Sequence, residues 1–324
     1  MIVSGIDKYL DKELWHPDSL VNLPSPLDPL QPDVSAVSHG IPIKTFFDSF
    51  DEIAKRPRSM SGDPLTLKLK ENWDQEDNFA ELLPKHYQDL MSHLPLQEYT
   101  VREGILNLAS RLPDCFVRLD LGPRLWGGYS QSTFNLQYNV SGMIHVMFHV
   151  YPDFKEDILD SLKYIGCDED SLELAQKEPK NVGAVWHIFH PKDVEKIREF
   201  VHMNAELQEC KSIKYNKDPL WLGTIPYMNL QLLKKLDSDF GIRSWTVVQM
   251  QGDGIFIPPG APYQVKILNA SMFVQTDFIS PEHIDLTMKV SCPDYHQVKN
   301  IVFHACKDAL SVLEMFPKSF GKQE

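Results

Sequence analysis

Residues 245–276 read WTVVQMQGDGIFIPPGAPYQVKILNASMFVQT, and this stretch decides the fold. It contains four short apolar segments rich in β-branched and aromatic residues, at 245–250, 254–258, 263–268 and 271–276. The joins between them are short and carry Gly, Pro or Asn, which favour tight turns. Short strands joined by tight turns are typical of an antiparallel barrel or sandwich.

The rest of the chain predicts further strands and several helices around this core. Short apolar or alternating segments predict strands at 3–6, 65–70, 116–121, 135–140, 144–150 and 184–189. Apolar residues at helical spacing predict helices at 43–54, 77–92, 192–207, 229–236 and 298–316, with Pro84 ending or kinking the second. Residues 153–180 are acidic and predict helix or loop. The expected fold class is an all-β core with flanking helices.

Composition limits the classes of function. Of the 324 residues, 43% are hydrophobic, which allows a large buried core. The net charge is −13, so the surface repels phosphate backbones and direct nucleic-acid binding is not expected. The same charge would attract a basic peptide, although the simpler interpretation is that it only aids solubility.

Cysteine spacing and hydropathy indicate the cellular compartment of the protein. No CxxC pair is present, so no zinc knuckle is expected. The five cysteines are Cys115, Cys167, Cys210, Cys292 and Cys306. Their odd number and wide spacing suit free thiols in a reducing compartment. The N-terminus lacks an apolar signal core and no run of about 18 apolar residues occurs, so we expect no membrane span and a cytosolic or nuclear protein.

Several sequence blocks together resemble a known family. They are LPLQEYT (94–100), GILNLASRLPDCFVRLDLGPRLWGGY (104–129), AVWHIFHPKDVEKIREF (184–200), GDGIFIPPGAPYQVKIL (252–268), DFISPEH (277–283) and QVKNIVFHACKDAL (297–310). In this order, over nearly the whole chain, they resemble the JmjC domain of the Hairless-type histone lysine demethylases. The resemblance implies a JmjC double-stranded β-helix (jelly-roll, cupin-like) as one domain over 1–324. Within it we expect an N-terminal flank (1–100), a barrel (101–285) and a C-terminal helix (286–324).

The resemblance also implies a cofactor chemistry, and this sequence departs from it. Family members use Fe(II) and 2-oxoglutarate to hydroxylate N-methyl groups, with the iron held by two His and one carboxylate. At the matching positions this chain has Gln137, Asn139 and Tyr263. Two neutral amides and a phenol are poor ferrous ligands. We therefore expect a degenerate metal site, no bound cofactor and no catalytic residues.

Three further positions belong to the implied cosubstrate pocket and are expected to be vestigial. Phe134 stands where some family members use a Thr to bind 2-oxoglutarate, and Lys155 is the nearest candidate for a cosubstrate lysine. His145 is expected to line the pocket or the core. His145 and His149 lie four apart on a predicted strand, so they should share a face about 13 Å apart, too far for one ion. If the segment is helical instead, the two side chains could meet on one ion.

The leading hypothesis is a catalytically inactive JmjC domain, a pseudo-demethylase that regulates chromatin and transcription in the nucleus by binding. Its expected partners are the histone H3 tail, chromatin proteins, or a second JmjC chain in a homodimer or in a heterodimer with an active relative. The alternative is an active or weakly active Fe(II)/2-oxoglutarate-dependent demethylase with non-standard ligands. A third possibility is a gene product without a function of its own.

Overall fold

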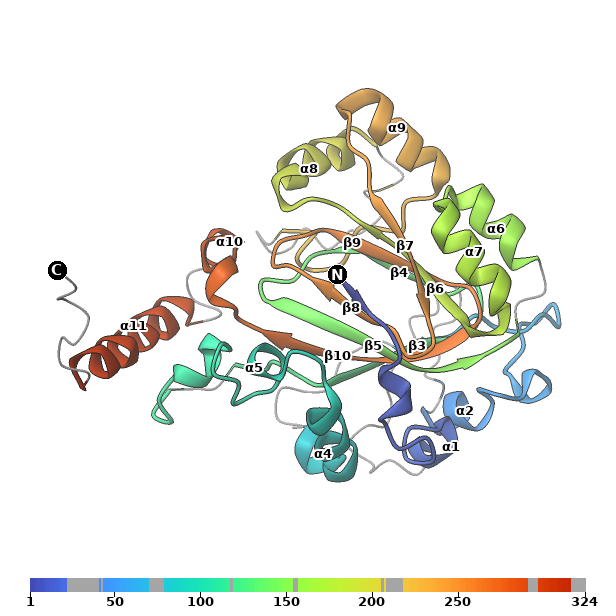
Figure 1. Cartoon of the computed structure of the whole chain (residues 1–324). Coiled ribbons are helices and arrows are strands. Elements are labelled where there is room, and N and C mark those ends of the chain that lie inside the picture. Colours follow the sequence, from blue (N-terminus) through green and yellow to red (C-terminus); the bar gives the residue numbers. More distant parts are fainter. Residues whose placement is uncertain are drawn as a thin grey trace.

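The centre of the molecule is a pair of antiparallel β-sheets with helices packed around them (Figure 1). The computed structural model describes residues 1–21, 41, 43–69, 79–116, 119–153, 157–204, 207, 218–290 and 297–315. Helices make up much of the chain outside the sheets, so the fold is mixed α/β, built on two antiparallel sheets. The predicted antiparallel strands and their flanking helices are confirmed at this level.

The larger sheet has six strands in the order β1-β8-β5-β10-β3-β2. Their bounds are β1 (Ile2–Val3), β2 (Lys68–Leu69), β3 (Arg124–Gly128), β5 (Gly142–Tyr151), β8 (Gly254–Ile257) and β10 (Ala270–Phe278). β10 lies at the centre, between β5 and β3. The short strands β1 and β2 come from the predicted N-terminal flank; the division of the chain at residues 100 and 285 stays a prediction.

The smaller sheet has four strands in the order β4-β9-β6-β7. Their bounds are β4 (Thr133–Gln137), β6 (Val182–Ile188), β7 (Trp245–Met250) and β9 (Tyr263–Ile267). The four strands predicted between residues 245 and 276 are β7 to β10, and they divide between the two sheets. The chain therefore crosses between the sheets within this stretch.

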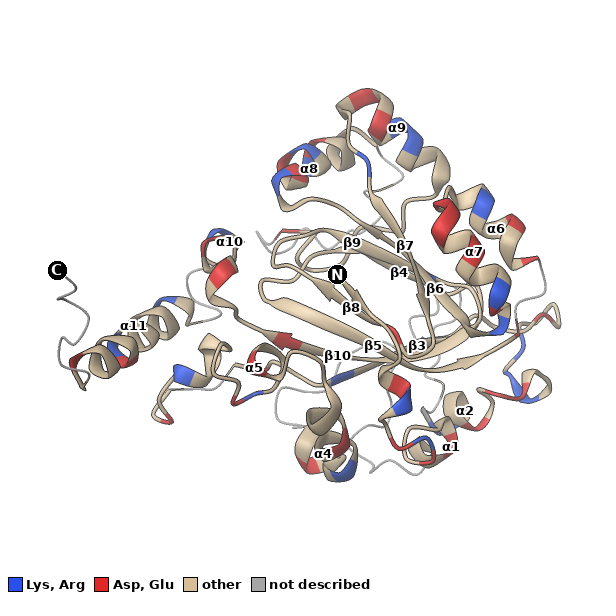
Figure 2. Ribbon diagram, viewed as in Figure 1, with Lys and Arg blue, Asp and Glu red and all other residues tan. Residues whose placement is uncertain are grey.

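Apolar side chains from both sheets form one cluster, which we call the intersheet core. Its buried members are Trp126, Phe134, Met143, Met147, Val150, Ala184, Trp186, Ile255, Ile257, Ala261, Tyr263, Val265, Ile267 and Phe273. Figure 2 shows that charged residues gather on the surrounding helices and loops and are few on the strands. The burial of so much apolar surface is the main force that holds the two sheets together.

An N-terminal layer covers the outer face of the larger sheet. It includes α1 (Pro17–Leu20), α2 (Ile43–Asp48), α3 (Phe79–Leu82) and α4 (Pro84–His93). Its apolar residues pack against the outward side chains of β5 and β10. The helix predicted at 77–92 is interrupted at Leu83 because Pro84, which cannot donate a backbone hydrogen bond, begins α4.

The other helices lie at the remaining faces and edges. These are α5 (Gln97–Thr100), α6 (Ile158–Ile165), α7 (Glu169–Lys177), α8 (Val194–Met203), α9 (Leu230–Phe240), α10 (Ile284–Val290) and α11 (Val298–Met315). α6 and α7 pack on the outer face of the smaller sheet, and α11 points away from the body (Figure 1). None of the helices described is both long and apolar enough to span a bilayer.

Two strand predictions differ from the structure. The strand predicted at 3–6 is Ile2–Val3, and Ile6 begins a 3-10 helix. The strand predicted at 116–121 is wrong. Residues 119–121 and Phe116 are not in a strand, and the strand begins later, at Arg124. The Asp120 carboxylate accepts a hydrogen bond from the backbone N–H of Gly122 at 2.9 Å, and Pro123 follows. This side-chain-to-backbone bond forms a turn, which delays the start of β3. Residues 117–118, like Cys210 and Cys292, lie outside the described residues, whereas Cys115, Cys167 and Cys306 are free thiols.

Candidate functional site

Two of the three candidate metal positions lie side by side at the end of the smaller sheet. Gln137 is the last residue of β4 and Tyr263 the first of β9, and they are paired across the two strands. The Gln137 Nε2 donates a hydrogen bond to the Tyr263 hydroxyl at 2.9 Å. The Tyr263 side chain is buried. The structure therefore brings these two side chains into direct contact through this hydrogen bond.

Asn139 lies just beyond the end of β4, and its side chain points elsewhere. Its Nδ2 is 3.3 Å from the Met143 sulfur and 3.5 Å from an oxygen of Asp277. Its backbone carbonyl accepts a hydrogen bond from Gly260 at 2.7 Å, in the turn that precedes Tyr263. The Asp277 carboxylate is also bonded to Arg124 at 3.0 Å. Asn139 thus belongs to a separate polar network near the same turn.

Residues 218–225, which we call the covering segment, run along the outer edge of β4. The backbone N–H of Leu136 donates to the carbonyl of Ile225 at 3.0 Å. Gly223 has φ +61, and a Cβ there would collide with the Gln137 amide oxygen. The positive φ and the close approach therefore favour glycine at this position. The covering segment shields Gln137, and its position could not be inferred from the sequence pattern.

His145 lies on β5 and points into the intersheet core. Its ring packs against Trp186 at 4.7 Å and Tyr263 at 6.1 Å between centroids. Burial, and secondarily the positive charge of Arg124, lowers the pKa of His145 to about 3. Within the described part of the chain, neither ring nitrogen has a hydrogen-bond partner. His145 is therefore a neutral imidazole held among aromatic rings.

The other two pocket positions have different outcomes. Phe134 is buried on β4, with its ring 5.2 Å from that of Trp126 and 5.8 Å from that of Phe273. It therefore fills space between the sheets, as expected for a side chain without a hydroxyl. Lys155 lies outside the described residues.

The prediction that His145 and His149 share a face is wrong. The pairing of β5 with β10 is irregular, because Met272 pairs with His149 and the next residue, Phe273, pairs with Met147. This β-bulge adds one residue to β5 and reverses the alternation of side chains after it. His149 consequently points away from the intersheet core, toward the N-terminal layer.

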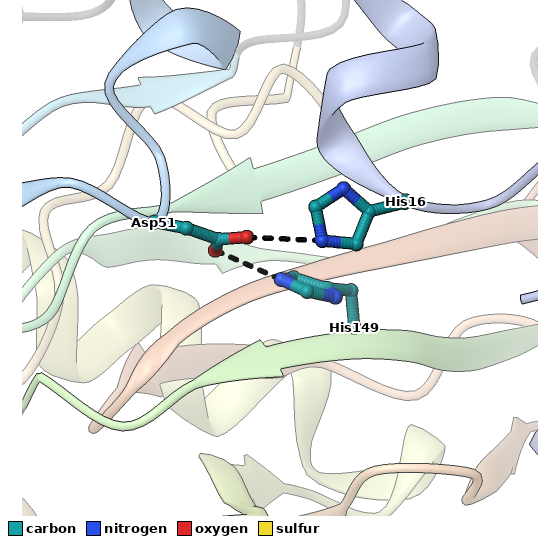
Figure 3. Close-up of side chains that lie close together, drawn as sticks. All are labelled: His16, Asp51 and His149. Carbon is teal, nitrogen blue, oxygen red and sulfur yellow. Dashed lines mark hydrogen bonds and ion pairs between the residues drawn. The ribbon is translucent and has the colours of Figure 1, made fainter. Parts of the chain in front are cut away.

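On this outer face His149 meets two residues that are distant in sequence (Figure 3). Its Nε2 lies 2.9 Å from one oxygen of Asp51, and the Nε2 of His16 lies 3.2 Å from the other. We call these three residues the outer cluster. In the described part of the chain it is the one group of three or more His, Cys, Asp or Glu side chains close enough to share an ion. The sequence pattern does not predict it, because no local motif links the three positions.

Comparison with known proteins defines the class. Residues 164–278 match the family described as JmjC domain, hydroxylase. The matched range includes Tyr263 but neither Gln137 nor Asn139. Residues 164–278 thus match a JmjC domain, and that family implies a cupin-like β-sandwich, in agreement with the two antiparallel sheets.

Individual proteins with similar sequences define the relationship more closely. The chain is 35% identical to lysine-specific demethylase 3A of Gallus gallus, over 99% of this chain and 26% of that protein. It is 33% identical to lysine-specific demethylase 3 of Drosophila melanogaster, over 97% of this chain and 40% of that protein. A human relative, probable JmjC domain-containing histone demethylation protein 2C, is also 33% identical, over 97% of this chain and 13% of its own length. The chain is related to the lysine-specific demethylase 3 proteins and spans less than half of their length.

Proposed function

We propose that this chain is a JmjC-domain protein without iron-dependent activity, which acts in nuclear chromatin regulation by binding a histone tail or a chromatin protein. One observation carries the proposal. At two positions that the family resemblance assigns to iron ligands, the Gln137 amide and the Tyr263 hydroxyl are hydrogen-bonded to each other at 2.9 Å. The bond turns the Gln137 amide nitrogen, which cannot bind a metal ion, toward the Tyr263 oxygen.

The chemistry of the donor atoms supports the same conclusion. Gln137 and Asn139 offer neutral amide oxygens, and the phenol of a tyrosine, with a reference pKa of about 10, is protonated near neutral pH. The family's ferrous site needs two imidazoles and an anion that leave positions open for cosubstrate and oxygen. The residues present therefore do not fit ferrous iron.

The space between the sheets also argues against a cosubstrate. The rings of Phe134, Trp126 and Phe273 pack together where a 2-oxoglutarate pocket is expected. Each is at least nine-tenths buried. Phenylalanine has no hydroxyl with which to bind a carboxylate, so neither iron nor 2-oxoglutarate is proposed as a cofactor.

Binding of a protein partner is supported by surface features. α11 is exposed along its second half, where Leu310, Val312, Leu313 and Met315 present apolar side chains to solvent. Exposed apolar groups of this kind mark protein interaction sites. The net charge of −13 favours a basic partner, such as the histone H3 tail. A second JmjC chain, identical or active, is the other partner proposed.

The alternative function, a weak iron oxygenase with non-standard ligands, has one observation in its favour. His145 is a neutral imidazole whose ring centroid lies 6.1 Å from that of Tyr263. Imidazole suits iron, so His145 is the residue that could join a rearranged site.

The test is an anaerobic calorimetric titration with Fe(II), with and without 2-oxoglutarate. It should use the Asp51→Asn protein, so that the outer cluster cannot contribute a signal. We expect no stoichiometric binding at sub-millimolar Fe(II), but measurable binding of an H3-tail peptide that a charge-matched scrambled peptide does not reproduce. Stoichiometric Fe(II) binding that Tyr263→Phe or His145→Phe abolishes would favour the oxygenase instead, and iron-dependent turnover of a methylated H3 peptide would establish it. Failure of both iron and peptide to bind would reject histone-tail recognition.

A further inference from the structure

We infer that His16, Asp51 and His149 form a binding site for a divalent transition-metal ion, with Zn²⁺ the best suited. The site lies on the outer face of the larger sheet, under the N-terminal layer, and is separate from the intersheet core (Figure 3). It is independent of the proposed function, because it uses none of the residues on which that proposal rests.

The ligand atoms already have nearly the required spacing. The Asp51 oxygens lie 2.9 Å from the His149 Nε2 and 3.2 Å from the His16 Nε2, and one ligand atom from each residue lies within 4.8 Å of the others. In a tetrahedral zinc site with bonds of about 2.0–2.1 Å, neighbouring ligand atoms are about 3.3 Å apart. Small side-chain rotations would therefore place all three around one ion.

Each ligand is presented by a different, supported part of the fold. His149 lies on β5, which is paired with the central strand β10. His16 is the N-cap residue of α1. Asp51 follows Phe50, which is fully buried and whose ring lies 5.8 Å from that of His149. An ion here would join the N-terminal layer to the sheet, as structural metal sites do.

A second carboxylate is placed to support His16 as a ligand. The Nδ1 of His16 accepts a hydrogen bond from the backbone N–H of Asp18 at 3.3 Å, and lies 3.4 Å from the Asp18 carboxylate. When Nε2 of a neutral imidazole binds a metal, the proton is on Nδ1. Metal binding would therefore replace the bond from the Asp18 N–H, and the Asp18 carboxylate could accept the Nδ1 proton instead, the arrangement found behind many zinc-bound histidines.

Exposure and charge determine which ion fits. The side chains of His16, Asp51 and His149 are 40%, 26% and 17% exposed. An ion could therefore enter from solvent, and water could complete its coordination. Two imidazoles select transition metals over Mg²⁺ and Ca²⁺, which prefer oxygen ligands. A single carboxylate neutralises half of the charge of the ion.

The chain offers a matched control for the simpler explanation that Asp51 only accepts hydrogen bonds from two histidines. His190 is also an N-cap residue, and its Nδ1 also accepts a backbone hydrogen bond from two residues onward, at 3.1 Å from Lys192. It differs from His16 in having no ion pair with a carboxylate among the described residues. A variant at His190 therefore repeats the capping change without touching the proposed site.

The experiment is a titration with Co²⁺, read by its visible absorption, and with Zn²⁺, read by calorimetry. It should be done on metal-stripped protein in which the exposed Cys115 and Cys306 are changed to Ser, which removes competing thiols. We expect about one equivalent to bind. His16→Asn, Asp51→Asn and His149→Gln should each weaken binding by at least roughly tenfold, by loss of one ligand. The control His190→Asn should leave it unchanged.

Folding of each variant is checked separately by its melting temperature in chelator. Saturating Zn²⁺ should raise the melting temperature of the parent by about 3–6 °C and that of Asp51→Asn by much less. The inference is overturned if the parent binds no metal up to millimolar concentration. It is also overturned if the three variants bind as tightly as the parent, or if the control loses binding equally. Metal bound in the intersheet core would survive Asp51→Asn, so the two proposals fail separately.

Discussion

Strand β5 presents one histidine to each side of the larger sheet, and one lies in an apolar environment while the other lies in a polar one. His145 points into the intersheet core, where it is neutral and packed among aromatic rings. His149 points outward, where it meets a carboxylate and a second imidazole. Four residues separate them, and the β-bulge between them decides which side each takes. The side of the sheet that each histidine faces determines whether its ring packs among aromatic side chains or contacts polar ones.

The same contrast holds for metal chemistry. At the core edge, the positions that the family resemblance assigns to iron carry two amides and a phenol. Outside, the outer cluster has two imidazoles and one carboxylate, the donor types that transition metals prefer. The comparison shows why a JmjC fold does not by itself establish iron-dependent activity. It also shows that metal binding by this chain, taken alone, would not establish it either.

The largest expected effect comes from giving the core the donors that it lacks. The triple variant Gln137→His, Asn139→Asp and Tyr263→His, made in the Asp51→Asn background, should gain stoichiometric Fe(II) binding that the background protein lacks. Imidazole and carboxylate donors would replace neutral amides and a phenol. Anaerobic calorimetry measures the gain, and circular dichroism checks the fold. A folded triple variant that still binds no iron would mean that packing, rather than donor identity, excludes the metal.

The next effect concerns the attachment of the N-terminal layer. The Arg56 guanidinium is paired with the Asp153 carboxylate, both almost fully buried, and Asp153 also accepts a hydrogen bond from the Ala270 N–H at 2.8 Å. Arg56→Met would leave a buried carboxylate without its counterion. We expect the free energy of unfolding, measured in urea, to fall by about 3–5 kcal/mol.

Two matched variants complete this measurement. Lys55→Met removes a neighbouring cation that is exposed and should change stability little. Asp51→Asn in metal-free protein should also have a small effect, because the outer cluster is partly open to solvent. A loss as large as that of Arg56→Met would show that the outer cluster is a structural anchor even without metal, and would weaken the contrast between the two regions.

A smaller effect is a pH dependence that arises from the core histidine. The pKa of His145 is lowered to about 3 in the folded protein, against about 6.5 in the unfolded chain. As the pH falls below about 6.5, the unfolded chain takes up the proton first. The contribution of the neutral His145 to the free energy of unfolding is therefore fully present above about pH 6.5 and is lost between about pH 6.5 and 3. His145→Phe should reduce the loss between pH 7.5 and 5 by about 2 kcal/mol.

Urea titrations of the parent and the variant across this range measure the difference. His187, whose pKa burial lowers to about 4, contributes a similar loss to both proteins and cancels in the comparison. Parallel stability curves for parent and variant would contradict a neutral, buried His145.

Much of the fold could be predicted from local pattern. Strands β7 to β10 follow from short apolar segments and tight turns, and β7 was predicted to its exact bounds, Trp245–Met250. Pro84 was also correctly predicted to interrupt a helix. These features depend on neighbours in the sequence, which the sequence displays directly.

The features that could not be predicted depend on contacts between distant residues. The β-bulge that turns His149 outward is visible only in the pairing of β5 with β10. The covering segment reaches β4 from more than 80 residues away, as the Asn135 amide bonded to the Gly223 carbonyl shows. The outer cluster joins Asp51 to a residue 98 positions along the chain. No periodicity or motif encodes such meetings.

The most direct test of the central claim is to locate a bound metal by anomalous X-ray diffraction from crystals soaked in Co²⁺ or Zn²⁺. We expect a peak between His16, Asp51 and His149, at about 2.0–2.1 Å from the imidazole Nε2 atoms, and none beside Tyr263. A peak at Gln137 and Tyr263, with none at the outer cluster, would contradict it.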